Sequence, residues 1–501
     1  MKRTILILPI ILLAAIALHA QGGLRPRGDV NCDWEVNLAD VNALVDTICS
    51  GARYHALFSY AADVNGDKEI NIADLNAVVS AIMGDKLKPM PACSGTLPVL
   101  FINTEGHRNI DSKEEYIHAD WWLDNMGIEG YQSIGTPDAP LGMQIKGRGN
   151  ATWTNLDKKP YRLKLDDKQP MMSMPSSRHW VLLANADQWM GKLNDVLPFE
   201  IGRRMGMAWN PRIEPVEVVL NGQYIGLYFL AEKIRVAKDR VNIEEQADME
   251  TDPEKVTGGW LLEIDNYVEP GNITFTEGNG MPFWVTPHSP EVLSGAQRDY
   301  ITSFLLSADT AIYTQDKESR LWEQYIDIDS LAVYYIVQEA VDNPEAFSGS
   351  CFMHKQQGSG AKLIFGPLWD CGSSFTRWSS TYEFNDFIYE NMPSYCRSRW
   401  ISEIAKFPRF QERVSYYWRR FYEEVYPKMD AYIDNFTIKF EAAGNADHVR
   451  WPQYNGNNTQ ARTNMYLKPC FHKKVDWLNT QWNGTQPPNT QPRASGNSSN
   501  P

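Results

Sequence analysis

The chain has 501 residues, of which 43% are hydrophobic and 22% charged. This composition indicates a globular protein of two or three domains and excludes a single small core. The net charge is −14 at pH 7 and no long basic run occurs, so nucleic acid is excluded as an expected partner. The 17 Trp and 23 Tyr are expected in the core, because their spacing forms no platform for a sugar.

The first residues, MKRTILILPIILLAAIALHA, have a basic start, an apolar centre and a small-residue end. This pattern predicts a secretory signal peptide over residues 1–20, with cleavage after Ala20. Its apolar stretch is too short for a membrane span, and no later stretch is long enough. We therefore expect a secreted, periplasmic or cell-surface protein without a membrane span.

Seven cysteines follow the predicted cleavage point. They are Cys32, Cys49, Cys93, Cys351, Cys371, Cys396 and Cys470. Because their number is odd, at least one is unpaired within a monomer, and the absence of CxxC makes a zinc site unexpected. A bridge between Cys351 and Cys371 is one option if the hairpin predicted below forms. The remaining pairing and the oligomeric state stay open.

Residues 29–84 contain a repeated loop pattern with a period of 34 residues. Each copy places oxygen-bearing side chains at loop positions 1, 3, 5, 9 and 12, the spacing that surrounds Ca²⁺. The first loop has Asp29, Asn31, Asp33, Asn37 and Asp40, and the second has Asp63, Asn65, Asp67, Asn71 and Asp74. Two loops in the same phase favour calcium binding over acidic turns that arose by chance.

A predicted helix follows each loop, with apolar residues spaced to form one buried face. These residues are Val41, Leu44, Val45 and Ile48 in the first helix and Leu75, Val78, Val79 and Ile82 in the second. The small, all-α, EF-hand-like unit resembles a dockerin, which implies bound Ca²⁺ and a protein partner. Loop position 6, usually Gly, is Trp34 or Lys68 here, and Cys32 stands at position 4 of the first loop. The first loop is therefore the weaker predicted site.

Three further segments follow the repeat. Residues 85–96 lie in a stretch rich in proline and glycine and are predicted to be a linker. A large core is expected over residues 97–483. Residues 484–501, rich in Pro, Asn, Ser and Gly, are predicted to be a disordered tail.

The core opens with predicted strands over residues 98–103, 143–146 and 161–165. The second strand leads into a turn containing Arg148 and Gly149, which either cradles phosphate or simply bends the chain. In the third strand, apolar residues alternate with Arg162 and Lys164, which predicts one basic face.

A hairpin signal follows at Asn221-Gly222, between the strands predicted over 216–220 and 224–230. Glu232 ends the second of these strands, and Glu263 and Asp265 end the next one. These acidic residues either line a nucleotide cleft or face water, and the sequence leaves both interpretations open.

The chain from residue 325 onward is predicted to be mostly helical, with a block over 402–425 broken at Pro408 and a last helix over 462–482. Within it, the runs 351–353 and 363–365 are joined by a glycine turn and predict a hairpin. The hairpin leads to Asp370, where a buried strand opens into a loop. A carboxylate there is suited to Mg²⁺ beside nucleotide phosphates, although Asp is also an ordinary turn residue.

Five motifs in order resemble the CotH family of atypical, secreted protein kinases over about residues 97–483. They are GRGNATW at 147–153, KKPYRLKL at 158–165, LNGQYIGLY at 220–228 with Glu232, GGWLLEID at 258–265, and the stretch from 338 to 375 that ends in PLWDCGSSF. The resemblance implies a two-lobed, protein-kinase-like core behind the dockerin-like unit. Strands early and helices late agree with an α+β fold class.

The resemblance also implies roles for individual residues. The reaction would move the γ-phosphate of ATP to a hydroxyl of a protein substrate, with Mg²⁺ or Mn²⁺ on Asp370. Lys164, Arg148 and Gly149 would contact the phosphates, and Glu232 would line the nucleotide site. Asn343 and Glu345 would form the catalytic loop that positions the acceptor.

Two departures from the family pattern leave other functions open. Glu345 stands where the family usually has Asp, and Gly372 stands where a second polar residue often lies beside the metal. The chain is therefore either an active kinase of low activity or a pseudokinase that binds without turnover. A third interpretation is an accessory or scaffold protein of an extracellular polysaccharide-degrading assembly, in which the dockerin is the working part.

Overall fold

The computed structural model describes most of the core and part of the N-terminal repeat. The described residues are 24–25, 28–31, 33, 35–51, 61–65, 69–84, 90–91, 93–186, 188, 190–269, 271–377, 381–396, 398–454 and 459–483. The predicted signal peptide and tail lie outside them, as do residues 85–89 and 92 of the predicted linker. Cys32, Trp34, Asp67 and Lys68 of the repeat also lie outside.

Two helices follow the repeated loops, α2 (Leu38–Ser50) and α4 (Ile72–Ile82). Each starts with the same capping box: an Asn side chain accepts from the helix backbone, and the Asp at the third helical position accepts in return. The helices pack around a small apolar cluster that includes Leu44 and Val78. A short strand pair, β1 (Leu24–Arg25) with β2 (Met90–Pro91), also lies in this part of the chain.

The predicted buried faces of these helices are only half correct. Leu44 and Val78 are buried, and Val41 and Leu75 are half-buried. The other four members of the predicted faces are exposed: Val45, Ile48, Val79 and Ile82. Two short helices bury one narrow stripe against each other, so the apolar residues one position or one turn away stay at the surface.

The chain as a whole is α+β and divides into two compact units. The first contains residues up to Lys192, Arg212–Lys233 and Ile433–Met465, and the second contains Leu193–Pro211, Ile234–Tyr432 and the residues from Tyr466 onward. Within the described part of the chain, no helix combines the length and the apolar composition that crossing a membrane requires.

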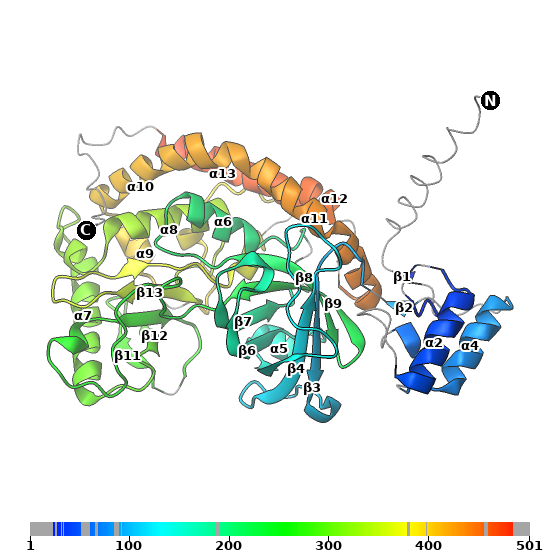
Figure 1. The fold of residues 1–501 in the computed structure, drawn as a ribbon. Helices are drawn as coiled ribbons and strands as arrows, with labels where there is room; N and C mark the ends of the chain where they lie inside the picture. The colour runs from blue at the N-terminus through cyan, green and yellow to red at the C-terminus, as the bar shows by residue number, and fades with distance from the viewer. Residues whose placement is uncertain are drawn as a thin grey trace, which may run out of the picture. The chain divides into compact units, whose positions relative to one another are not determined.

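The first unit is built on a closed seven-stranded barrel (Figure 1). Going around it, the strands are β3 (Val99–Thr104), β4 (Ile117–Asp124), β5 (Leu141–Gly147), β6 (Tyr161–Gln169), β7 (Ser177–Leu183), β9 (Gln223–Glu232) and β8 (Ile213–Leu220). Neighbouring strands are antiparallel except β3 and β8, whose parallel pairing closes the barrel. Closure leaves the sheet without a free edge.

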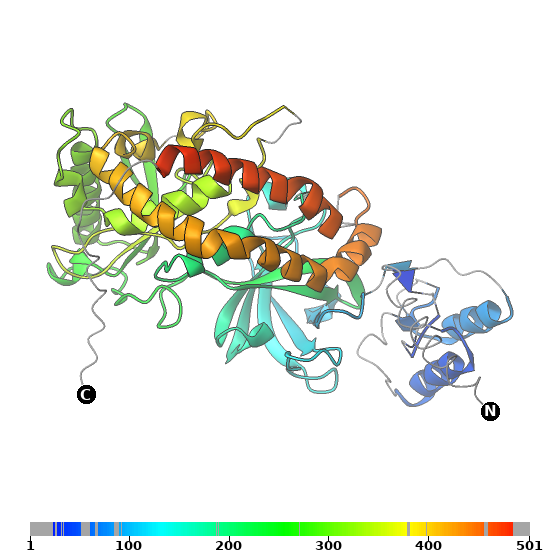
Figure 2. The ribbon, with the colours of Figure 1, turned by 90° about the horizontal axis from the view of Figure 1, so that it is seen from above.

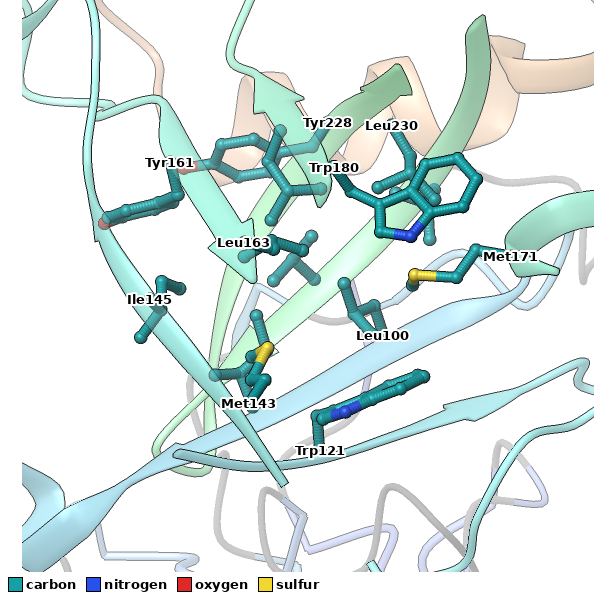
Figure 3. Packing of buried hydrophobic residues seen from close by; sticks show 14 of the residues in the cluster. Leu100, Trp121, Met143, Ile145, Tyr161, Leu163, Met171, Trp180, Tyr228 and Leu230 are labelled. Carbon is teal, nitrogen blue, oxygen red and sulfur yellow. The ribbon is translucent and has the colours of Figure 1, made fainter. Parts of the chain in front are cut away.

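Alternation of apolar and polar residues explains how these strands close around a core. On β6, Leu163 and Leu165 are buried while Lys164 between them is exposed, as the sequence pattern predicts. Figure 3 shows side chains from different strands, among them Trp121, Met143 and Trp180, pointing toward one another inside the barrel. The predicted hairpin at Asn221-Gly222 joins β8 to β9.

A buried ionic cluster connects the barrel to helix α11 (Met429–Arg450), whose residues from Ile433 onward belong to this unit. The ammonium of Lys158 lies 2.7 Å from Asp447, and that of Lys192 lies 3.5 Å from it, all three side chains being almost fully buried. Asp447 also accepts the backbone N–H of Leu227 at 3.0 Å. Burial lowers the pKa of Lys158 to about 8, against the opposing effect of Asp447. Short helices α5 (Ala151–Asn155) and α12 (Thr459–Arg462) complete the unit.

The second unit contains a five-stranded sheet in the order β11 (Ile273–Thr276), β12 (Pro282–Ser289), β10 (Trp260–Ile264), β13 (Cys351–Lys355) and β14 (Ile364–Phe365). All neighbours are antiparallel. The predicted hairpin of residues 351–365 is therefore confirmed. The expectation of strands early and helices late is wrong in this unit, because these strands are interleaved with helices along the chain.

The described residues of the second unit include the helices α6 (Val196–Arg204), α7 (Gly295–Ile312), α8 (Ile328–Ala340), α9 (Trp400–Ile404), α10 (Pro408–Arg420) and α13 (Lys468–Trp482). Figure 2 shows α10 and α13 side by side, and both pack on α8, which is buried along most of its length. The break predicted at Pro408 is confirmed: α9 ends at Ile404 and Pro408 begins α10, since the first helical position needs no N–H donor.

The described cysteines are all free thiols, namely Cys49, Cys93, Cys351, Cys371, Cys396 and Cys470. The bridge considered between Cys351 and Cys371 is therefore absent. Both residues are buried, and burial raises the pKa of the Cys351 thiol to about 12. These two cysteines are core residues of the second unit.

The Lys158–Asp447 contact predicts a large stability effect. Asp447→Asn would leave two buried lysines without their carboxylate, so we expect the free energy of unfolding to fall by about 3–5 kcal/mol. Urea unfolding followed by tryptophan fluorescence measures this. Asp434→Asn, at a half-buried position on the same helix, is the control and should cost far less. Equal losses in the two variants would contradict the assigned role of Asp447.

Candidate functional site

Three loops leave the same end of the five-stranded sheet. Ile264 at the end of β10 pairs with Cys351 at the start of β13, and β14 runs antiparallel to β13. The loop after β10, the loop before β13 and the loop after β14 therefore meet at one end of the sheet. Asp265, Glu345 and Asp370 lie on these loops.

The Asp370 loop has an unusual backbone that is held by the two residues just before α6. Asp370 is exposed and lies in the left-handed region, with φ of 50°. The N–H of Cys371 donates to the carboxylate of Asp195 at 2.8 Å. The amide of Asn194 donates to the carbonyl oxygens of Gly372 and Ser374, both at 2.9 Å. The position of Asp370 is thus fixed by two residues far away in sequence.

A second carboxylate, Asp265, lies in the electrostatic range of Asp370. Burial, then the charge of Glu263 and, more weakly, that of Asp370 raise the pKa of Asp265 to about 7. The carboxylate of Glu263 is buried and contacts His288 Nε2 at 2.5 Å. Glu263 on β10 and Asp265 just after it therefore do not simply face water, and Asp265 adds a carboxylate within the electrostatic range of Asp370.

The carboxylates of Asp265 and Asp370 are candidate ligands for Mg²⁺ or Mn²⁺. Among the described residues, no group of three or more His, Cys, Asp or Glu side chains is arranged to hold a metal. Mg²⁺ beside nucleotides commonly uses only one or two carboxylates, with phosphate and water oxygens completing its shell. Asp265 and Asp370 fit that donor set, since a cation would stabilise the charged form of Asp265, which burial and, to a smaller extent, the charges of Glu263 and Asp370 disfavour.

The carboxylate of Glu345 accepts hydrogen bonds from two side-chain hydroxyl groups of the protein. One carboxylate oxygen accepts from Ser373 Oγ at 2.6 Å, and the other accepts from the phenolic hydroxyl of Tyr395. Ser373 lies three residues after Asp370, so Glu345 is tied to the Asp370 loop. A carboxylate that binds hydroxyl donors has the chemistry needed to position an acceptor alcohol.

Asn343 is buried in the same loop. Its amide N–H donates to Gln338 Oε1 at 3.0 Å, and its amide oxygen accepts the N–H of Glu345 at 3.3 Å. Both ends of the amide therefore shape the loop that presents Glu345. The catalytic role predicted for Asn343 stays a prediction.

A buried charge cluster, which we call the Lys474 cluster, lies beneath these loops. Lys474 on α13 contacts Glu339 on α8 at 3.0 Å and Asp342 at 3.3 Å, and all three side chains have zero exposure. Asp342 also pairs with Arg377, in the segment that follows Asp370. The Glu339 carboxylate accepts the N–H of Ile388, and burial raises its pKa. The sequence offered no signal for this cluster, because Lys474 is far in the chain from Glu339 and Asp342.

The predicted nucleotide contacts belong to the first unit. Lys164 is exposed on the outer side of β6, where its ammonium lies 5.9 Å from the ring centre of Tyr116. Arg148 is half-buried in the turn after β5, and Gly149 has φ of 84°. Glu232 is buried and accepts the backbone N–H of Arg212 at 2.8 Å and its guanidinium at 3.1 Å. The carboxylate of Glu232 therefore holds Arg212.

The described calcium-loop residues share one arrangement in both copies. The carboxylate of Asp40 accepts backbone N–H groups of Val30, Asn31 and Asn37 at 2.6, 3.0 and 2.8 Å. In the second copy, Asp74 accepts those of Asn65 and Asn71 at 3.0 and 2.9 Å.

The first residue of the first loop, Asp29, is fully buried, and its carboxylate accepts the N–H of Asp33 at 2.9 Å. The described donors at the predicted positions are oxygens of Asp and Asn, which suit a hard cation. Calcium binding stays a prediction.

Comparison with known proteins gives a family. No match was found among the curated proteins. A family model described as CotH kinase protein matches residues 145–478, which include the barrel strands from β5 onward and all the loops of the candidate site. Because this match covers well over half of the sequence, the chain belongs to the CotH kinase family.

Proposed function

We propose that this CotH protein binds a complex of ATP with Mg²⁺ or Mn²⁺ and transfers the γ-phosphate slowly to a hydroxyl of a protein. The observation that carries the proposal is the meeting of Asp265, Glu345 and Asp370 at one end of the sheet. Carboxylates for a cation, beside a carboxylate that binds hydroxyl groups, are the parts that phosphoryl transfer needs.

Each residue then has a separate task. Asp370 and Asp265 hold the cation, which supplies positive charge against the phosphate oxygens. Glu345 orients the acceptor hydroxyl and accepts its proton. Lys164, Arg148, Gly149 and Glu232 belong to the proposal as nucleotide contacts through the family resemblance alone. The two-lobed, kinase-like arrangement is part of the same proposal and agrees with the division of the chain into two compact units.

The second candidate function is that of a pseudokinase, which binds nucleotide without turnover, and the contacts of Glu345 favour it. Both oxygens of Glu345 already accept hydroxyl groups, and the longer Glu side chain stands where the family usually has Asp. Displacement of a reacting group by about an ångström can cost roughly a hundredfold in rate. Nucleotide binding, which depends on Asp370 and Asp265, would then survive while turnover is slow or lost.

The N-terminal repeat is proposed to be a calcium-binding dockerin that joins a secreted protein to a protein partner, in an extracellular assembly that degrades polysaccharide. The matching capping boxes and the matching contacts of Asp40 and Asp74 support two loops of the same backbone arrangement. So short a unit buries little apolar surface, and bound cations would add the missing stability.

Replacing Asp370 tests the proposed transfer. Asp370→Ala should abolish phosphate transfer and weaken binding of Mn²⁺–ATP at least as much as loss of an outer-shell partner, roughly tenfold to a hundredfold. Labelled ATP with purified full-length chain measures transfer, and calorimetry measures binding. Asp316→Ala, at an exposed loop position of the same unit, is the control. If the natural chain binds no nucleotide with either cation, the proposal is wrong.

The raised pKa of Asp265 predicts a pH dependence. A proton on this carboxylate competes with the cation, so affinity for Mn²⁺–ATP should rise as pH increases through about 7 and level off above it. Below that point, each pH unit should cost up to about tenfold for one competing proton. Titrations between pH 5.5 and 8.5, chosen around that pKa, measure it.

Two variants separate Asp265 from other groups that titrate in this range. Asp265→Asn should flatten the profile. Glu277→Gln is the matched control, because burial also raises the pKa of Glu277 to about 7 while its contacts are Arg399, Tyr313 and Asn279. If Glu277→Gln flattens the profile and Asp265→Asn does not, Asp265 is not the competing group.

The dockerin proposal predicts two calcium sites with unequal contributions. Asp63→Ala should remove one bound Ca²⁺, and should cost more stability than Asp29→Ala if the first loop is the weaker. With free Ca²⁺ at about a hundredfold above Kd, each site adds about 2.7 kcal/mol of stability. Calorimetric titration and melting with and without a chelator measure both. Asp46→Ala, exposed on α2, is the control, and unchanged melting in chelator would refute the proposal.

A further inference from the structure

The segment that follows the Asp370 loop returns to the candidate site. Residue Tyr395 lies on a short turn in which the N–H of Cys396 donates to the carbonyl of Pro393 at 2.9 Å. From this turn its phenolic hydroxyl donates to the carboxylate of Glu345. Fifty residues of sequence separate the two partners, so the contact is tertiary.

The turn is anchored after Tyr395 and not by its ring. Cys396 is buried, and its sulfur lies 3.8 Å from the amide nitrogen of Asn266. The N–H of Ser398 donates to Ser348 Oγ at 3.2 Å. By contrast, the side chain of Tyr395 is 55% exposed. Its hydroxyl contact with Glu345 is therefore what directs this ring to the site, and core packing is not.

The hydroxyl of Tyr395 binds the Glu345 carboxylate, which in the proposed reaction binds the hydroxyl of the acceptor. In phosphoryl transfer, the positioning carboxylate accepts the hydroxyl of the substrate before the phosphoryl group moves. Glu345 already has one oxygen on Ser373, which ties it to the Asp370 loop, and Tyr395 takes the other. Burial and the hydrogen bond to Glu345 raise the pKa of Tyr395, so the phenol keeps its proton and stays a donor at neutral pH.

We propose that Tyr395 is an internal mimic of the acceptor, which keeps Glu345 occupied until an external hydroxyl displaces it. This inference rests on the proposed kinase function. The mimic is a competitor and not a substrate: it lowers the fraction of molecules able to take an acceptor, and the apparent affinity for the acceptor falls by the same fraction. Nucleotide binding should be untouched, because the hydroxyl of Tyr395 binds Glu345, which serves the acceptor in the proposed reaction and not the cation.

Removing the hydroxyl while keeping the ring is the direct test. A hydrogen bond to a charged group is worth a factor of roughly ten or more in an equilibrium. Tyr395→Phe should therefore lower the KM for an external acceptor, with dephosphorylated casein as the probe, by about tenfold. The KM for Mn²⁺–ATP should not change. A merely structural Tyr395 would not separate the two constants.

A matched control and a second measurement accompany this variant. Tyr131→Phe also removes a tyrosine hydroxyl that donates to a glutamate, Glu214, but in the first unit, and should change neither constant. Independently of turnover, nitration of Tyr395 by tetranitromethane needs the phenolate. Nitration at this residue should be several-fold faster in Glu345→Gln than in the natural chain, because the carboxylate that keeps the phenol protonated is gone.

The outcomes separate this inference from the proposed function. A lower acceptor KM in Tyr395→Phe with faster nitration in Glu345→Gln supports the mimic. Equal acceptor KM in the natural chain and Tyr395→Phe overturns the mimic and leaves the kinase proposal standing. Phosphate found on Tyr395 itself by mass spectrometry also overturns it, since the residue would then be a substrate. Absence of nucleotide binding in every variant overturns both proposals.

Discussion

The candidate site depends on the burial of one lysine ammonium. Lys474 has no access to water, and an unpaired charge in such a place would cost several kcal/mol. Its partners Glu339 and Asp342 come from a helix and from the loop before β13, and Asp342 in turn binds Arg377 from the segment after Asp370. Because no member can leave without exposing or stranding a charge, the cluster fixes the loops that carry Glu345 and Asp370 relative to each other. The geometry of the candidate site at the end of the sheet therefore depends on these buried ion pairs.

The first unit follows the same principle with different residues. Asp447 on α11 pairs with Lys158 and Lys192 and accepts a backbone N–H of β9. A helix late in the chain is therefore held to a strand that lies much earlier in the sequence. Lysines that are hydrogen-bonded and paired satisfy the rule for buried charge, and they fix geometry more than they add net stability. In this chain, buried lysines therefore serve the fold. The exposed Lys164, which the sequence pattern placed on a basic face, is available for a ligand.

Local sequence patterns predicted much of the fold, whereas contacts between residues far apart in the sequence could not be predicted. Alternation predicted β6, Asn221-Gly222 predicted the β8–β9 hairpin, and the glycine turn predicted the β13–β14 pair, because each signal lies within one element or one turn. Asp370 was placed at a strand exit for the same reason. Asn194, Asp195 and Lys474 were missed, since they reach the site from more than a hundred residues away. Four residues of the predicted buried faces of α2 and α4 are exposed, because periodicity locates an apolar face on a helix but does not show how much of that face another element covers.

The two departures from the family pattern have different consequences once the loops are assembled. Gly372 offers no side chain to a cation, but in the proposed site Asp265, from the loop after β10, would supply the second carboxylate, because coordination depends on position in space and not on spacing in sequence. Glu345 has no such substitute. Its extra methylene carries the carboxylate to Ser373 and Tyr395, whose hydroxyls satisfy it within the chain. Cation binding is therefore the more robust half of the proposed activity. In the proposed reaction, turnover would be limited at the acceptor side, where an external hydroxyl would have to compete with the hydroxyls of Ser373 and Tyr395.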